Sequence, residues 1–209
     1  YARPGDKLRW LNELIGHASV LPLVSSYRVL KMTHLEHHKH TNNPDLDPDY
    51  DAHAPSALAA MWKALKVRNP KSEQLLSYEK TLDRLDPDQA GLAKRDGIII
   101  NLTYLAVLFA MGATGHALEA FLLWVLPLVL ALVYIRFFLS WAPHHPGHGT
   151  GRYRDTRAFK SLFGVIGTMG MTVHIVHHLH PRIPLDRTPA AFREMRPILE
   201  ARNCDLGGL

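Results

Sequence analysis

Two long apolar runs interrupt an otherwise polar chain. Residues 97–115 read GIIINLTYLAVLFAMGATG without a charge, and residues 120–141 read AFLLWVLPLVLALVYIRFFLSW with Arg136 as the single charge. At a rise of 1.5 Å per residue, each run is long enough to cross a hydrocarbon core about 30 Å thick. The pattern therefore predicts two transmembrane helices. The alternative is two buried helices of a water-soluble protein, but the rest of a 209-residue chain provides little to cover them.

The basic residues predict which side of the membrane each flank occupies. The connection at residues 116–119 has no Lys or Arg, whereas the segments on both sides of the two runs carry many. They are Lys63, Lys66, Arg68, Lys71, Lys80, Arg84, Lys94 and Arg95 before the first run, and Arg152, Arg154, Arg157 and Lys160 after the second. By the positive-inside rule, both flanks are expected to be cytoplasmic.

Shorter apolar stretches complete the expected fold. Residues 11–30 and 162–176 are broken or too short to span, and we interpret them as interfacial or half-buried helices. Residues 189–209 contain an amphipathic helical pattern. The expected fold is an all-α integral membrane protein in one domain, residues 1–209, with two transmembrane helices and a cytoplasmic helical cap.

The net charge indicates which partners suit the chain, and the cysteine content excludes two kinds of covalent or metal site. The formal charge of +5 suits an anionic membrane surface or an acidic partner protein. Nucleic acid is not expected, because the basic residues flank apolar spans and do not form a separate basic element. Cys204 is the single cysteine, which excludes an intrachain disulfide and a thiolate zinc site.

Histidines form two clusters of identical spacing. One cluster is His34, His37 and His38, and the other is His174, His177 and His178; His40 and His180 follow two residues later. Residues at i, i+3 and i+4 share one face of a helix, so three imidazoles of each cluster point the same way. Two membrane crossings separate the clusters, which places both on the cytoplasmic side. Imidazole suits iron, zinc, copper and nickel.

The number of histidines favours a site for two metal ions. The chain has no H-E-x-x-H motif, and catalytic zinc usually takes three protein ligands, so six imidazoles exceed what one zinc ion needs. His144, directly after the second run, is the first choice for an additional ligand, and His145 is the second. The isolated His17, His53 and His116 are expected to be surface or hydrogen-bonded residues.

Acidic residues follow the first cluster at every second position. They are Asp45, Asp47, Asp49 and Asp51. Such carboxylates can orient metal-binding histidines by accepting their second N–H, although solvated loop positions are the expected role for most of them.

The motifs resemble those of a known family. The string HLEHHKHTNNPD at residues 34–45, with Asp47-Pro48-Asp49 after it, resembles the second histidine box of the membrane fatty acid desaturase superfamily. The string HIVHHLHPRIP at residues 174–184 resembles the third box. The resemblance covers nearly the whole chain and is to bacterial acyl-lipid desaturases and the related carotenoid hydroxylases and ketolases. The first box, H-x-x-x-H or H-x-x-x-x-H, has no counterpart here, and we expect the chain to begin just after it.

The resemblance implies a function and a set of ligands. It implies two non-haem iron ions held by His34, His37, His38, His144, His174, His177 and His178, O2 as co-substrate, and no catalytic side chain besides the ligands. It also implies a lipid or fatty acyl substrate, a ferredoxin or cytochrome b5-like electron donor, and the bacterial inner membrane as location. The expected reaction is acyl-lipid desaturation. Carotenoid hydroxylation or ketolation is the nearest alternative, and a non-catalytic metal-binding membrane remnant is another.

Overall fold

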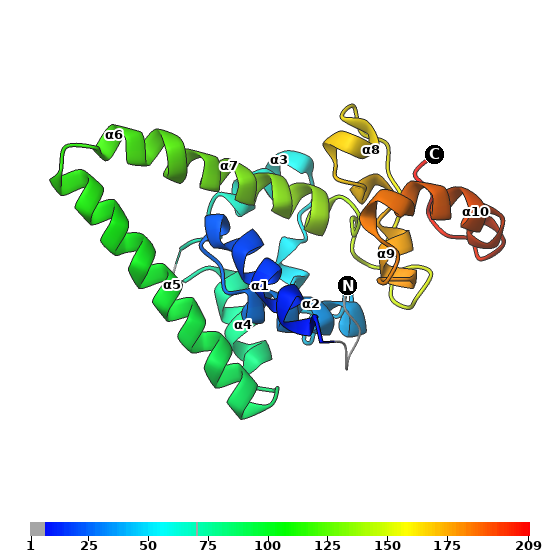
Figure 1. The fold of residues 1–209 in the computed structure, drawn as a ribbon. Helices are drawn as coiled ribbons and strands as arrows, with labels where there is room; N and C mark the ends of the chain where they lie inside the picture. The colour runs from blue at the N-terminus through cyan, green and yellow to red at the C-terminus, as the bar shows by residue number, and fades with distance from the viewer. Residues whose placement is uncertain (1–6, 70) are drawn as a thin grey trace. The chain divides into compact units, whose positions relative to one another are not determined.

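A computed structural model of the chain describes residues 7–69 and 71–209, which form helices joined by turns and loops (Figure 1). No β-strand occurs in that part of the chain. The elements before the first apolar run are α1 (Arg9–Val20), η1 (Leu21–Leu23), α2 (Tyr27–His40), η2 (Tyr50–Ala52), α3 (Ala57–Ala64) and α4 (Glu73–Leu82).

The remaining elements contain both apolar runs and the C-terminal helices. They are α5 (Pro87–Ala113), α6 (Ala117–Ala120), the π-helical turn η3 (Phe121–Val125), α7 (Leu126–Ile135), a second π-helical turn η4 (Arg136–Trp141), α8 (Gly164–Gly167), η5 (Met171–Val173), α9 (Ile175–Leu179), η6 (Leu185–Arg187) and α10 (Thr188–Ala201). The fold is therefore all-helical in the described residues, as the sequence predicted.

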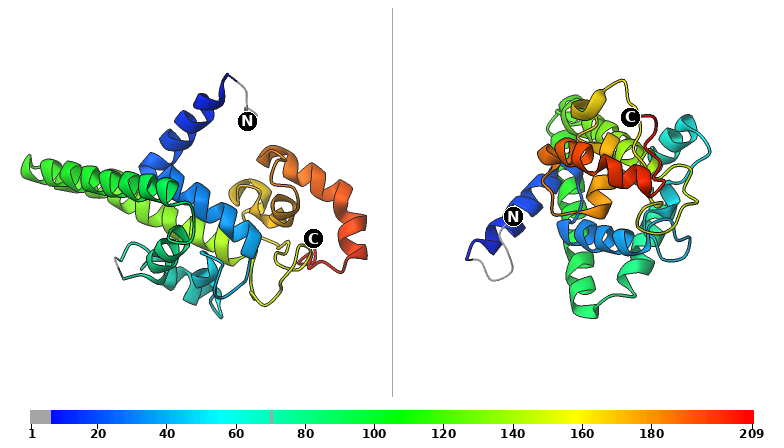
Figure 2. Two further views of the ribbon diagram at one scale, coloured as in Figure 1. Left: turned by 90° about the horizontal axis from the view of Figure 1, so that it is seen from below. Right: turned by 90° about the vertical axis from the view of Figure 1, so that its right-hand side faces the viewer.

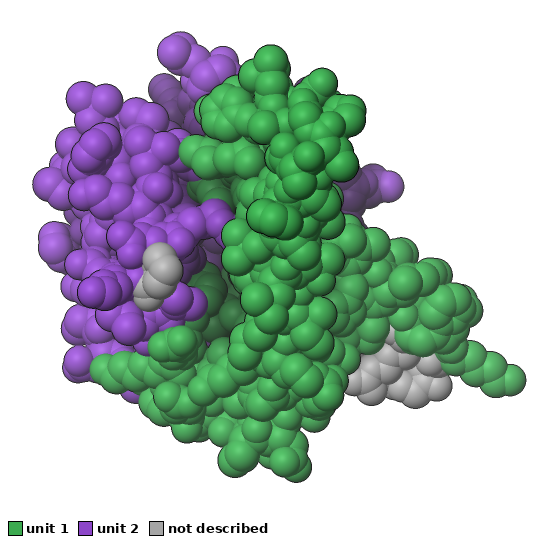
Figure 3. Space-filling model, turned by 90° about the vertical axis from the view of Figure 1, so that its left-hand side faces the viewer, with its two compact units in different colours: residues 1–35, 78–132 green, residues 36–77, 133–209 purple. Residues whose placement is uncertain are grey.

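The chain divides into two compact units (Figure 3). The first unit contains residues 1–35 and 78–132, and the second contains residues 36–77 and 133–209. In the first unit, Val24, Tyr104 and Leu128 form one buried cluster, in which the rings of Tyr104 and Trp124 meet edge to face at 5.1 Å. These contacts hold α5 against the start of the second apolar helix.

Both apolar runs are helical, and each helix is longer than the predicted span. The first helix, Pro87–Ala113, begins ten residues before residue 97, because Asp86 caps it through the backbone N–H of Gln89 and Pro87 fits the first helical position. The second is continuous from Ala117 to Trp141. Both are long and apolar enough to cross a membrane, and only 6% and 11% of their most apolar windows are buried by protein.

The second unit has its own apolar cores. The larger one joins Val173, Ile175 and Val176 to Phe192 and Leu199 of α10, so that α9 and α10 pack together, as the views in Figure 2 also show. The predicted amphipathic helix in residues 189–209 is confirmed as α10.

The shorter apolar stretches are broken, as their composition indicated. Residues 11–30 form α1, η1 and the start of α2, with Val24 in a left-handed conformation at φ 53° between them. Residues 162–176 contain α8, η5 and the start of α9 instead of one helix, since Gly164 and Gly170 both have positive φ.

Candidate metal centre

The first histidine cluster lies on α2, as its spacing predicted. Ser26 accepts a hydrogen bond from the N–H of Val29 at the start of this helix, and His37 and His38 are in its last turn. His34 stands one turn earlier on the same helix. The two units divide α2 between residues 35 and 36, so His34 is described with the first unit and its role as a ligand stays a prediction.

The second cluster is held by a very short helix. His174 is at the junction of η5 and α9, and His177 and His178 are on α9, which has only five residues. A helix this short is not stable by itself, so tertiary packing must hold it. Ile175 and Val176, which are both fully buried in the larger core, fix the helix and thereby the direction of the imidazoles.

His144 follows η4 in a turn and is buried at 5% exposure. Its Nδ1 lies 3.1 Å from the backbone carbonyl oxygen of Asp155, to which it donates as an N–H. This bond leaves Nε2 as the acceptor nitrogen, and Nε2 is buried without a hydrogen-bond partner among the described residues. His145 does not join the cluster: its ring packs on Trp141 at 4.7 Å.

Three imidazoles from three separate elements converge in the second unit. The rings of His37, His144 and His178 lie 4.8 to 5.1 Å from one another, and one ligand atom of each falls within 4.8 Å of the others. His174 adjoins this group, with its ring 4.8 Å from that of His178. Like Nε2 of His144, Nε2 of His178 is buried and has no hydrogen-bond partner within residues 7–69 and 71–209.

A second pair of histidines lies beside this group. The Nε2 atoms of His38 and His177 are 3.0 Å apart, and the ring of His38 stacks on that of His178 at 4.2 Å. At this separation, two nitrogen lone pairs face each other unless one nitrogen carries a proton or both bind one cation. Of the seven predicted ligands, the structure thus brings six together in the second unit.

Burial favours the neutral, metal-binding form of two of these histidines, His144 and His178. Burial lowers the pKa of His144 and of His178 well below the ordinary value, and neighbouring imidazoles lower it further. Both therefore stay neutral, the form that binds metals. Burial also lowers the pKa of His37, but the hydrogen bond to Asp47 and the charges of Asp49 and Asp47 outweigh it and raise the pKa overall.

Asp47 is the carboxylate that orients a histidine. Its Oδ1 lies 2.8 Å from Nδ1 of His37 and accepts the N–H of Asp49 at 2.9 Å, while Oδ2 accepts the N–H of Asn42 at 2.8 Å. Nε2 of His37 is then directed away from the carboxylate, in the manner of a metal-binding histidine whose other nitrogen is fixed. Of the acidic residues that follow the first cluster, Asp47 thus has the geometry of a carboxylate that orients a histidine.

Asn42 connects two of the histidines. Its φ of 63° is left-handed, which Asn tolerates better than most residues, and it directs the side chain to the backbone carbonyls of Gly149 at 2.6 Å and Asp155 at 2.9 Å. The Asp155 carbonyl is also the acceptor for His144. One amide therefore joins the loop that positions His144 to the loop that positions His37.

The arrangement fits transition-metal ions on three independent observations. The Nε2 atoms of His144 and His178 are buried and have no hydrogen-bond partner among the described residues, Asp47 fixes the tautomer of His37, and the donor set is entirely imidazole. Imidazole donors suit iron, zinc and copper. A cavity of about 480 Å³ reaches His38 and His178 from the side of Lys39 and Arg152 and provides a route to the cluster.

Sequence reasoning missed the role of Arg136. This residue begins η4, the last part of the second apolar helix, and is buried, with Nη2 2.5 Å from Oδ2 of Asp51 and Nη1 3.5 Å from Oδ1 of Asp49. The sequence did contain an indication of this ion pair, because a single charged residue in an apolar run normally has a partner of opposite charge. His53, expected to be a hydrogen-bonded residue, contacts Oδ1 of Asn42 at 3.1 Å.

Comparisons with known proteins agree with this geometry. The profile of the fatty acid desaturase family matches residues 3–205. The chain is 26% identical to a beta-carotene ketolase of Paracoccus sp. (strain N81106 / MBIC 01143) over 174 residues, which are 79% of this chain and 58% of the ketolase. No solved structure gave a significant match.

Acyl-lipid desaturases match over shorter segments. An sn-1 acyl-lipid omega-3 desaturase (ferredoxin) of Nostoc sp. (strain 36) is 34% identical over 41% of this chain and 24% of its own length. An sn-1 oleoyl-lipid 12-desaturase of Anabaena variabilis is 37% identical over 27% of this chain and 16% of its own length. The chain thus spans little more than half of the ketolase and smaller parts of the desaturases. Because the family profile matches residues 3–205, nearly the whole chain, the chain belongs to the fatty acid desaturase family.

Proposed function

We propose that residues 1–209 form a single fatty acid desaturase-like domain of an O2-dependent di-iron desaturase that acts on fatty acyl chains of lipids. The observation that carries the proposal is the convergence of imidazoles from α2, α9 and the turn after η4, with two buried nitrogens left for a metal. The ligand set we propose is His34, His37, His38, His144, His174, His177 and His178.

The proposed location is a bacterial inner membrane. The helices Pro87–Ala113 and Ala117–Trp141 expose apolar side chains on most of their surface, which is typical of helices that lipid covers and unlike the core of a water-soluble protein. The basic flanks favour a cytoplasmic location for the histidines by the positive-inside rule. Electrons then come from a soluble donor such as a ferredoxin, the donor named for the Nostoc relative.

The protein's residues supply ligands and orientation. When bound, the iron pair supplies the activation of O2 and the removal of hydrogen from an unactivated C–H bond. The neutral imidazoles of His144 and His178 are available as ligands without the loss of a proton, because burial has already lowered their pKa. Asp47 and the Asp155 carbonyl keep the rings of His37 and His144 in place before any metal arrives.

A second candidate function is oxygenation of a carotenoid. The Paracoccus ketolase matches across 79% of this chain, far more than either desaturase does. The desaturases are more identical, but only over segments of 57 and 86 residues. The histidine cluster serves both reactions, so the substrate distinguishes them.

Expression of the complete coding sequence in two bacterial hosts tests the proposal. One host supplies saturated and monounsaturated acyl lipids, the other supplies beta-carotene, and both receive a ferredoxin and its reductase. New double bonds in acyl chains, measured by gas chromatography with mass spectrometry, would support the desaturase. Oxygenated carotenoids would establish the second candidate instead.

Matched variants connect either product to the cluster. His144→Ala should abolish it, whereas His148→Ala, which changes an exposed histidine four residues later, should leave it unchanged. Iron-loaded protein that makes neither product and consumes no O2 on reduction would be a non-catalytic metal-binding protein, and the proposal would be wrong.

A further inference from the structure

The segment 162–169 exposes apolar side chains outside both long helices. Leu162 and Ile166 are essentially fully exposed, at 104% and 93%, and Phe163 and Met169 expose more than half of their surface. None of these residues belongs to the histidine cluster. A contiguous apolar surface of this kind marks an interaction site.

Two contacts fasten this segment to the side of the second apolar helix. The hydroxyl of Tyr134 donates to the backbone carbonyl of Gly167, and the rings of Phe138 and Phe163 meet edge to face at 5.9 Å. Tyr134 lies seven residues before Trp141, which is roughly 10 Å along the helix axis. If that helix crosses a bilayer, as the proposed function holds, segment 162–169 enters the interfacial layer of the same bilayer.

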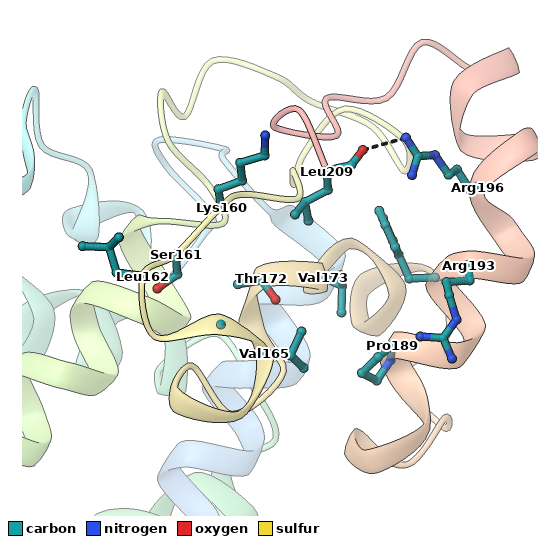
Figure 4. A pocket seen from close by; sticks show the side chains of 12 residues that line it. Lys160, Ser161, Leu162, Val165, Thr172, Val173, Pro189, Arg193, Arg196 and Leu209 are labelled. Atoms are coloured by element: carbon teal, nitrogen blue, oxygen red, sulfur yellow. Dashed lines mark hydrogen bonds between the residues drawn. The ribbon is translucent and has the colours of Figure 1, made fainter.

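A pocket of about 600 Å³ lies between this segment and α10 (Figure 4). Val165, Val173 and Phe192 give it apolar walls, and Lys160 and Arg193 lie at opposite ends of its lining. Arg196 lines it as well, held by the backbone carbonyl of Leu209 and by Glu200. The described lining residues include no Asp or Glu, so the pocket is positively charged at its edge and apolar inside.

One polar group inside the pocket has no partner. Thr172 is buried at 3% exposure, and its Oγ1 makes no hydrogen bond among the described residues. A buried hydroxyl without a partner destabilises the protein, and a ligand that forms a hydrogen bond with it would recover that loss. The pocket therefore combines a buried hydrogen-bonding group, apolar walls and a cationic edge.

We propose that this pocket binds an anionic phospholipid of the bilayer. Arg193 contacts the headgroup phosphate, since a guanidinium can donate two parallel hydrogen bonds to phosphate oxygens. The Thr172 hydroxyl donates to an ester oxygen of the lipid, and the acyl chains continue over Leu162 and Ile166. Lys160, at the other end of the lining, adds positive charge, which favours a net negative headgroup over a zwitterionic one.

Lipid retention by the purified full-length protein tests this site. The protein is reconstituted in phosphatidylcholine nanodiscs with a short-chain phosphatidylglycerol as probe, and bound lipid is measured by native mass spectrometry. We expect phosphatidylglycerol to bind at least tenfold more tightly than short-chain phosphatidylcholine. Lys160→Glu with Arg193→Glu should remove that preference, and Thr172→Val, which keeps the side-chain shape, should weaken binding severalfold.

A charge-matched control separates the pocket from general surface charge. Arg182→Glu with Arg187→Glu alters two exposed basic residues outside the pocket and should change binding less than twofold. Equal losses in both double variants, equal binding of both lipids, or displacement by inorganic phosphate alone would overturn the proposal. Thermal unfolding of each variant identifies loss of fold, in which case Thr172→Val provides the decisive comparison.

The outcome is independent of catalysis. Lipid binding is measured without iron, O2 or a reductant, so a negative result leaves the proposed desaturase untouched. If the protein stays in solution without detergent or lipid, the membrane location itself fails, and the lipid site fails with it.

Discussion

Replacement of Asp47 by Asn should separate the orienting carboxylate from the metal ligands. The carboxylate accepts three hydrogen bonds, from His37, Asn42 and the N–H of Asp49, at 2.8 to 2.9 Å. An amide has one oxygen in place of two, so its NH2 group must face a donor on one side. Asp47→Asn keeps the size of the side chain and removes its charge and one acceptor.

Each of the two amide orientations has a defined cost. If the NH2 group faces Asn42, a buried backbone N–H loses its acceptor, at about 1–3 kcal/mol of folding free energy. If it faces His37, Nδ1 must act as acceptor, and the proton moves to Nε2, where the metal would bind. Loss of such an orienting partner lowers metal affinity about 10- to 100-fold, equivalent to roughly 1.4–2.7 kcal/mol.

Iron affinity of the purified full-length protein measures this effect. Wild-type protein, Asp47→Asn and the control Asp45→Asn are equilibrated with iron(II) against a graded series of a competing chelator, and retained iron is counted. Asp45 is the exposed carboxylate two residues earlier, so its variant should match wild type. If Asp47→Asn holds iron as tightly as Asp45→Asn does, Asp47 does not orient a ligand and the reasoning is refuted.

Three further predictions concern the same unit. His144→Gln should reduce bound iron by about one ion per chain in elemental analysis, and an unchanged count would exclude His144 as a ligand. Burial lowers the pKa of His144 and His178, so below pH 6.5 the unfolded chain binds more protons than the folded chain does. The unfolding free energy of the metal-free protein should therefore fall by about 1.4 kcal/mol per histidine for each pH unit of acidification. Urea titrations at pH 5 to 7 should show this slope reduced by one histidine in His144→Gln. Arg136→Met should destabilise the protein by about 3–5 kcal/mol, since it leaves a buried carboxylate without its cation, and adding Asp51→Asn should restore part of the loss in thermal unfolding.

The sequence predicted the parts of the site that depend on local spacing. The i, i+3, i+4 pattern correctly placed the first histidine cluster on one helix, α2. For the second cluster the same pattern described only part of the structure, because α9 begins at Ile175 and His174 precedes it. Buried apolar neighbours, and not helix propensity, bring those rings together, and such packing depends on residues distant in sequence.

Contacts through the backbone could not be predicted. Asp155 positions His144 through its carbonyl oxygen, which every residue possesses, so no residue type marked the position. The preference for His144 over His145 did agree with the geometry, since only the first turns into the cluster. The first apolar helix begins earlier than the sequence predicted. Hydropathy detects only where a helix is apolar, whereas Asp86 and Pro87 determine where this helix begins.

The acidic loop after α2 shows why alternating residues of one type have different roles. Asp45 is exposed, Asp47 accepts from His37, and Asp49 and Asp51 face Arg136. Burial raises the pKa of Asp51, and the cation of Arg136 opposes part of that increase, so the ion pair offsets some of the desolvation of the carboxylate. The loop thus ties the helix that carries three candidate ligands, α2, to the end of the second apolar helix. A shift of this loop by one residue would remove the carboxylate partners of both His37 and Arg136. Both side chains would then be buried without those partners, and loss of one partner from a buried ion pair is strongly destabilising. The alternation of Asp residues therefore fixes the register of the metal centre relative to the end of that helix.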